Sequence, residues 1–115
     1  MSDVVIWHNP RCSTSRKALE LLAERGIQPK VRLYLQDSPD AEEIGAVLRA
    51  MDRPAGALLR WKEPEVAELG LQPDLPEETL IAAMATHPRL IERPVVIRGD
   101  RAALGRPAEA VLALF

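Results

Sequence analysis

The sequence predicts an α/β layered domain with a mixed sheet of about four strands, whose two halves are separated by a helical insertion. Three observations support this fold class. A β-branched run, an amphipathic run with helical spacing and a second strand-like run follow one another at the N-terminus. Short helical segments fill the middle of the chain. Strand patterning returns only near the C-terminus, which gives the order β-α-β, several helices, then β-β-α.

The N-terminal half is predicted to form a strand, a helix and a second strand. Val4–His8 is short, β-branched and followed by Asn9-Pro10, as is typical of a buried strand. Apolar residues recur at helical spacing from Ser13 to Arg25, and Gly26 supplies a C-terminal stop. Val31–Leu35 alternates apolar and polar residues. This run predicts a second strand, parallel to the first if the helix is a crossover.

The segment from about residue 38 to about residue 88 is predicted to be a helical insertion in which prolines separate short helices. The predicted helices are Asp40–Met51, Ala55–Arg60, Pro64–Leu69 and Glu77–Thr86. Beyond them, Pro94–Arg98 and Arg101–Leu104 are expected to pair as a hairpin around Gly99-Asp100. Pro107–Phe115 closes the chain as a short helix with proline in its first turn. Residues 1–115 are expected to form a single domain.

Composition excludes several classes of function. The net charge is −2 and no basic run is present, which argues against nucleic acid as a partner. No apolar run approaches the roughly 20 residues that a membrane span needs, and Met1–Ile6 lacks the features of a signal peptide. A single cysteine cannot form an internal disulfide, so we expect a reducing, cytoplasmic location. The spacing of histidines, cysteine and glycines predicts no bound metal and no nucleotide cofactor.

Cys12 is the candidate catalytic residue. It lies between the first predicted strand and the first predicted helix. A thiol at a helix N-terminus meets aligned backbone N–H groups and the positive end of the helix dipole, and both favour the reactive thiolate. Arg11 and Arg16 add positive charge nearby in the sequence. The pattern therefore predicts a nucleophilic cysteine in an anion-binding loop, whereas the alternative is a cysteine that packs as a small apolar residue.

Four segments carry a resemblance to a known family: His8-Asn9-Pro10-Arg11-Cys12-Ser13-Thr14-Ser15-Arg16, Leu59-Arg60, Glu92-Arg93-Pro94 and Gly105-Arg106-Pro107. In this order and spacing they resemble the glutaredoxin-coupled arsenate reductase family. The resemblance covers essentially the whole chain and implies a thioredoxin-like fold. Because the sequence stops at Phe115, it looks more like the short, chromosomal branch of that family.

The resemblance implies a role for each matching residue. Cys12 corresponds to the position that attacks arsenate. The oxyanion would be bound by the three matching arginines, which are Arg60, Arg93 and Arg106. The supporting residues are His8 behind the cysteine loop, Asn9 and Ser15 within it, and Pro94, which is expected to follow a cis peptide bond. Judged without the family, each arginine has an even chance of being an ordinary surface residue.

The predicted chemistry is the neutralisation of an oxyanion followed by thiol-dependent reduction. Guanidinium groups are always charged and present planar forks of donors, so they suit a tetrahedral oxyanion such as arsenate. Backbone N–H groups at the helix start add to that cradle, and the candidate hydroxyl donors are Ser13, Thr14 and Ser15. The family scheme implies that glutathione attacks the thiol–arsenate adduct and that glutaredoxin then releases arsenite. Glutathione is thus a co-substrate, and no bound cofactor is expected.

Two other functions are open at this stage. One is a glutathione-linked thiol oxidoreductase without arsenate activity. The other is a regulator of the Spx type, which shares the fold and the cysteine loop and binds RNA polymerase. Spx proteins usually carry a Cys-x-x-Cys pair, and Ser15 occupies the second position here. The three matching arginines also favour the reductase.

Overall fold

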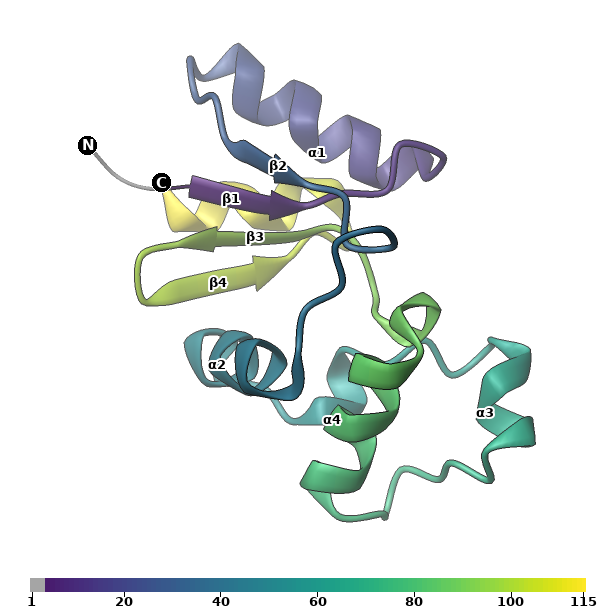
Figure 1. Ribbon diagram of the computed structural model, residues 1–115. Coiled ribbons are helices and arrows are strands. Elements are labelled where there is room, and N and C mark those ends of the chain that lie inside the picture. Colours follow the sequence, from purple (N-terminus) through teal and green to yellow (C-terminus); the bar gives the residue numbers. More distant parts are fainter. Residues whose placement is uncertain (1–3) are drawn as a thin grey trace.

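The computed structural model describes residues 4–115, so Met1–Asp3 of the N-terminal stretch lie outside the described residues. A four-stranded mixed sheet organises the fold in the order β2-β1-β3-β4 (Figure 1). Its strands are β1 (Val4–Trp7), β2 (Lys30–Arg32), β3 (Val95–Arg98) and β4 (Arg101–Leu104). β2 runs parallel to β1, whereas β3 is antiparallel to both β1 and β4. The predicted α/β architecture is confirmed.

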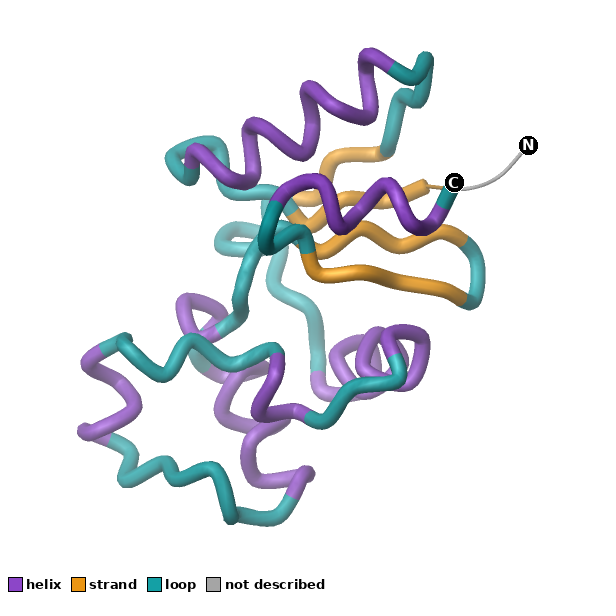
Figure 2. The backbone as a smooth tube through the Cα atoms, turned by 180° about the vertical axis from the view of Figure 1, so that it is seen from behind, coloured by secondary structure: helices purple, strands orange, loops and turns teal. Residues whose placement is uncertain are grey.

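The sheet separates two apolar cores. Helix α1 (Ser13–Glu24) and the 3₁₀ helix η3 (Ala108–Leu114) cover one face, and α2 (Ala41–Met51) lies against the other (Figures 1 and 2). Successive side chains of a strand point to opposite faces. Ile6 accordingly packs with the first core and its neighbour Trp7 with the second. Both cores therefore meet at β1, the strand that leads into the cysteine loop.

Helix α1 forms where the amphipathic pattern predicts it. Its inward positions are buried and are Ser15, Ala18 and Leu22. The helix ends because Gly26 adopts a φ of +73°, a left-handed conformation that costs a residue without a Cβ little. Leu22 and Ala18 belong to the same apolar core as residues of η3 and β3, so α1 is held against this face of the sheet.

The segment between β2 and β3 is built from short helices, as predicted, but the expected helix Ala55–Arg60 is only a 3₁₀ turn, because Leu59 pairs with Ile91 in an isolated bridge. After α2 come η1 (Ala55–Ala57), α3 (Pro64–Glu68), α4 (Glu77–Thr86) and η2 (Pro88–Leu90). α2 begins at a capping box, in which the Asp40 side chain accepts from the Glu43 N–H and the Glu43 side chain accepts from the Asp40 N–H. Among residues 4–115, no helix has both the length and the apolar character needed to cross a bilayer.

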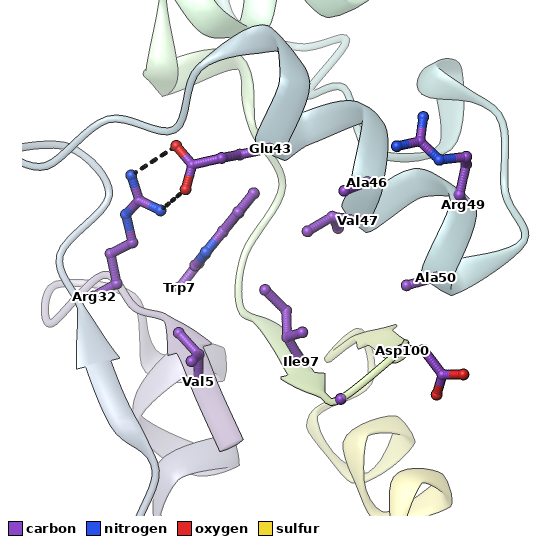
Figure 3. Close-up of a pocket in the computed structure, with 11 residues that line it drawn as sticks. Val5, Trp7, Arg32, Glu43, Ala46, Val47, Arg49, Ala50, Ile97 and Asp100 are labelled. Atoms are coloured by element: carbon purple, nitrogen blue, oxygen red, sulfur yellow. Dashed lines mark hydrogen bonds and ion pairs between the residues drawn. The ribbon is translucent and has the colours of Figure 1, made fainter. Parts of the chain in front are cut away.

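The prediction for the second strand was partly wrong. β2 ends at Arg32, and the backbone turns because the N–H groups of Gln36 and Asp37 both donate to the carbonyl of Leu33. Tyr34, expected on the polar side, is only 1% exposed. Arg32 lies over the ring of Trp7 at 5.9 Å and pairs with the Glu43 carboxylate (Figure 3). Contacts with α2 thus decided which side chains face inward.

The C-terminal part follows the prediction with one exception. Gly99-Asp100 forms the loop of the β3–β4 hairpin, with Gly99 at a φ of +61°. The last helix is of the 3₁₀ type rather than α-helical. It begins at the segment Gly105-Arg106-Pro107, where the Gly105 N–H donates to the carbonyl of Pro94 at 2.8 Å. This bond joins the two segments that carry the predicted anion-binding arginines Arg93 and Arg106.

We expect Gly105→Ala to destabilise the protein. A Cβ at this position would lie 2.7 Å from Cγ of Pro94 and 3.0 Å from Cγ1 of Val111. The ring of Pro94 and the methyl group of Val111 are both buried and have little room to move. Overpacking of this kind costs about 1–3 kcal/mol, measurable as a lower free energy of unfolding in urea. The control is Gly45→Ala in α2, where the nearest atom is the flexible Arg49 Nη1 at 3.4 Å. There the gain in helix propensity should stabilise by about 0.5–1 kcal/mol, and equal effects of the two changes would contradict the prediction.

Candidate functional site

Cys12 occupies the N-cap position of α1. Its backbone is extended, with φ −95° and ψ 120°, and its side chain is 9% exposed. The loop that carries it is closed by two backbone bonds, from the Cys12 N–H to the Asn9 carbonyl and from the Arg16 N–H to the Cys12 carbonyl, both at 3.0 Å. Cys12 therefore lies at the end of α1 where backbone N–H groups lack helical partners, as the sequence predicted, but its side chain makes no capping hydrogen bond.

The surroundings of Cys12 favour its thiolate. Burial raises the pKa of the thiol, but the nearby backbone N–H groups of Ser15 and Thr14 and the positive charge of Arg93 lower it. The net effect is a pKa below the ordinary value of a cysteine. Since the thiolate is the nucleophilic form, the structure places a reactive cysteine at this position.

His8, Asn9 and Ser15 hold the cysteine loop from behind. Nδ1 of His8 lies 2.6 Å from Oγ of Ser15, which also accepts from the Asn9 N–H at 3.1 Å. Burial, followed by the charge of Arg16, lowers the pKa of His8. A lowered pKa favours the neutral ring. Through this contact His8 positions Ser15, which lies in the first turn of α1 behind Cys12. The hydroxyl of Ser15 is fully buried, so the expectation that it donates to a bound anion was wrong.

The sheet brings Arg93 to Cys12. Trp7 at the end of β1 pairs with Val95 at the start of β3, so the loop after β1 and the segment before β3 lie at the same edge of the sheet. The Arg93–Pro94 peptide bond is cis, as the family resemblance implied, and Arg106–Pro107 is cis as well. A hydrogen bond of 3.2 Å from Arg106 Nη1 to the Arg93 carbonyl ties the second arginine to the first.

The third arginine arrives from the helical segment. Leu59 and Ile91 form an isolated antiparallel bridge. On either side of it the Arg60 N–H donates to the Leu90 carbonyl and the Glu92 N–H donates to the Leu58 carbonyl, both at 2.7 Å. This pairing fixes Arg60 beside the segment that continues to Arg93. The three predicted arginines, far apart in sequence, therefore lie together.

The arginines surround a carboxylate that the sequence did not single out. Oε1 of Glu92 lies 3.3 Å from Arg93 Nη1, 3.8 Å from Arg60 Nε and 3.9 Å from Arg106 Nε. A pocket of about 300 Å³ opens here, and its lining residues are Leu59, Arg60, Trp61, Lys62, Glu92, Arg93 and Arg106. Cys12 does not line this pocket, and Arg93 connects the pocket with the thiol. Glutamates are ordinary at a protein surface, so only the position of Glu92 next to Arg93 hinted at a role.

Tyr34 is a second residue that sequence reasoning missed. Burial raises its pKa, the charges of Arg93 and Arg60 oppose that effect, and the charge of Cys12 adds to it. The side chain of Asn9 lowers the pKa as well. Tyr34 is thus a buried residue whose titration responds to Cys12 and to two of the site's arginines.

A larger groove lies elsewhere and does not contain this chemistry. It has a volume of about 560 Å³ and runs between the sheet and α2, past Trp7, Val47 and Ile97 (Figure 3). Two of its four charged lining residues, Arg32 and Glu43, are paired with each other. Neither Cys12 nor any of the three arginines lines it. Within the described residues 4–115, no group of three or more His, Cys, Asp or Glu side chains is placed to hold a metal ion.

The chain is similar over its whole length to known proteins. An arsenate reductase of Neisseria meningitidis serogroup A is 43% identical over 117 residues and covers 100% of both chains. An uncharacterized Escherichia coli K12 protein, YfgD, is 46% identical over 112 residues, which span 96% of this chain and 94% of that protein.

The structural comparison gives the same result. The solved structure of an arsenate reductase from Vibrio cholerae superposes with a TM-score of 0.94 at 44% identity, covering 99% of this chain and 98% of that one. The predicted thioredoxin-like α/β fold is confirmed by such neighbours. The sequence profile of the ArsC family matches residues 7–114. With its cysteine loop and its three arginines in place, this chain belongs to the ArsC family.

Proposed function

We propose that this protein is an arsenate reductase that converts arsenate to arsenite, with Cys12 as nucleophile. The observation that carries the proposal is that three guanidinium groups converge within 4 Å of one carboxylate oxygen, and that one of them, Arg93, is a close neighbour of the Cys12 thiol at the N-cap of α1. The relatives from Neisseria meningitidis and Vibrio cholerae that carry the name arsenate reductase match over nearly their whole length. Both facts favour chemistry on an oxyanion.

The first step is attack of the thiolate on arsenic. An S–As bond forms, an As–O bond breaks, and the departing oxygen leaves as water after protonation. Two negatively charged reactants repel each other, so the site must neutralise the oxyanion before they meet. Arg93, Arg60 and Arg106 supply three permanent positive charges and forked donors for this purpose. No change in oxidation state occurs in this step.

The second stage is the reduction, and its electrons come from outside the chain. Reduction of As(V) to As(III) takes two electrons, which two thiols provide when they become one disulfide. Cys12 is the only cysteine of the chain, so it cannot form that disulfide internally. Glutathione and a glutaredoxin are the proposed donors, and the cytoplasm, where such thiols stay reduced, is the proposed location.

We expect Cys12→Ser to abolish arsenate-dependent turnover. The test is NADPH oxidation coupled through glutathione reductase, glutathione and glutaredoxin, with and without arsenate. A serine hydroxyl is a far weaker nucleophile than a thiolate, so the rate should fall to background. Unchanged thermal unfolding of the variant would show that the fold is intact.

The same assay separates the alternatives. Turnover that Cys12→Ser retains would refute the role of the thiol. Reduction of glutathione-containing disulfides by the wild type, without any response to arsenate, would favour a thiol oxidoreductase instead.

The reactivity of Cys12 should persist to lower pH than that of a free thiol, whose pKa is about 8.5. The site lowers the pKa of Cys12, and the thiolate is the form that alkylates, so the midpoint of iodoacetamide reactivity against pH should lie below that of glutathione. Arg93→Gln removes the neighbouring charge and should move the midpoint upward. Arg25→Gln, at the far end of α1, should leave it in place, and an equal shift in both variants would contradict the assignment.

Arg106→Ala should impair the handling of arsenate while leaving the thiol reactive. Loss of one donor that stabilises the developing charge costs on the order of 10²–10³ in rate, so kcat/KM for arsenate should fall by about that factor. Arg25→Ala is the matched control, because Arg25 is an exposed arginine outside the site. Equal kinetics of the two variants would contradict a role of Arg106 in binding arsenate.

A further inference from the structure

One oxygen atom of Glu92 lies within 4 Å of all three arginines. Oε1 approaches Arg93 most closely, at 3.3 Å, and the Nε atoms of Arg60 and Arg106 lie at 3.8 and 3.9 Å. A single carboxylate thus sits at the point where three guanidinium groups converge. In the proposed reaction, that point is where the negative charge of the oxyanion must be compensated.

The contacts of Glu92 with the arginines are loose. Well-formed N–H···O hydrogen bonds are about 2.7–3.2 Å long, and two of the three contacts of Glu92 Oε1 are clearly longer. By contrast, Arg60 Nη2 and Glu63 are 3.1 Å apart. Among the described residues, Nε of Arg93 is buried and has no hydrogen-bond partner. The carboxylate therefore compensates charge but leaves donors free that a four-oxygen anion could fill.

The charges at the convergence point do not balance. Arg60, Arg93 and Arg106 bring three positive charges, and Glu92 brings one negative charge. Glu63 offsets part of the remainder, but it is shared between Arg60 and Arg89. A net positive charge is left beside the Cys12 thiolate, which suits an anionic ligand.

Glu92 has a fixed backbone and a side chain that can leave. Its N–H donates to the Leu58 carbonyl at 2.7 Å, next to the Leu59–Ile91 bridge, so the residue itself cannot move away. Its side chain is 26% exposed, and rotation about its own torsions would carry the carboxylate into water. Displacement of the carboxylate therefore requires no change in the fold.

We propose that Glu92 is the resident counter-anion of the oxyanion site, and that an oxyanion binds by taking the place of its carboxylate among Arg60, Arg93 and Arg106. When no ligand is bound, the Glu92 carboxylate holds the three arginines together. A ligand must interact with these arginines more strongly than the carboxylate does in order to replace it. A dianionic tetrahedral ligand does so, because it brings more charge and more acceptor oxygens than one carboxylate. This inference rests on the proposed function, since it assigns a specificity-determining residue to the same site.

The test measures the binding of inorganic phosphate, which has the shape of arsenate but is not reduced. Isothermal titration calorimetry compares the wild type with Glu92→Gln, which removes the charge and keeps the size. Without its internal competitor, the site should bind phosphate about tenfold more tightly, equivalent to 1.4 kcal/mol. The midpoint of Cys12 alkylation should also move to lower pH, because a negative charge next to Arg93 is gone. A merely structural role for Glu92 would produce neither change.

Glu65→Gln is the matched control. Glu65 contacts Arg89 at 3.7 Å and none of the three arginines of the site, so phosphate affinity should stay at the wild-type value. Glu92→Ala is a second charge-removing variant and should act in the same direction if Glu92→Gln folds poorly. Unchanged or weaker phosphate binding in a folded Glu92 variant would overturn the proposal.

The two proposals can fail separately. Tighter phosphate binding in Glu92→Gln, in a protein without arsenate turnover, would support the counter-anion and refute the reductase. Unaltered phosphate affinity of Glu92→Gln, in a protein that reduces arsenate, would support the reductase and refute the counter-anion.

Discussion

The site depends on keeping negative charge on a sulfur atom that is largely withdrawn from water. Burial alone would favour the neutral thiol of Cys12, so every stabilising contact has to be supplied by the fold. α1 supplies backbone N–H groups, and the antiparallel pairing of β1 with β3 supplies Arg93. The buried contact between His8 and Ser15 then holds the loop in the position where these groups converge.

The order of the elements could be predicted because it rests on local patterns. The amphipathic run in α1, the capping residue Asp40 and the Gly99-Asp100 hairpin loop each encode their own structure within a few residues. β2 could not be delimited in this way. Its end depends on Arg32 pairing with Glu43 and on Tyr34 packing in the apolar core, and both contacts involve residues from other elements.

The residues of the site also differ in whether local sequence patterns could predict them. Cys12 could be recognised from its place before a helix, and the arginines could be recognised only through the family resemblance. Neither argument reached Glu92, because a glutamate carries no local mark of its partners. Its role emerges from the bridge between Leu59 and Ile91, which sets Arg60 beside it, and from Arg106 arriving across the Gly105–Pro94 contact. The contacts between residues far apart in the chain are therefore what could not be predicted from the sequence alone.

The brevity of β2 has a consequence for association with other proteins. An edge strand with free backbone groups invites a further strand from another chain, and natural sheets counter this with short, charged edges. β2 has three residues, two of which are Lys30 and Arg32. Extension of the sheet past β2 is thus disfavoured. Association of another protein with this edge is therefore expected to use side-chain contacts and not the addition of a strand to β2.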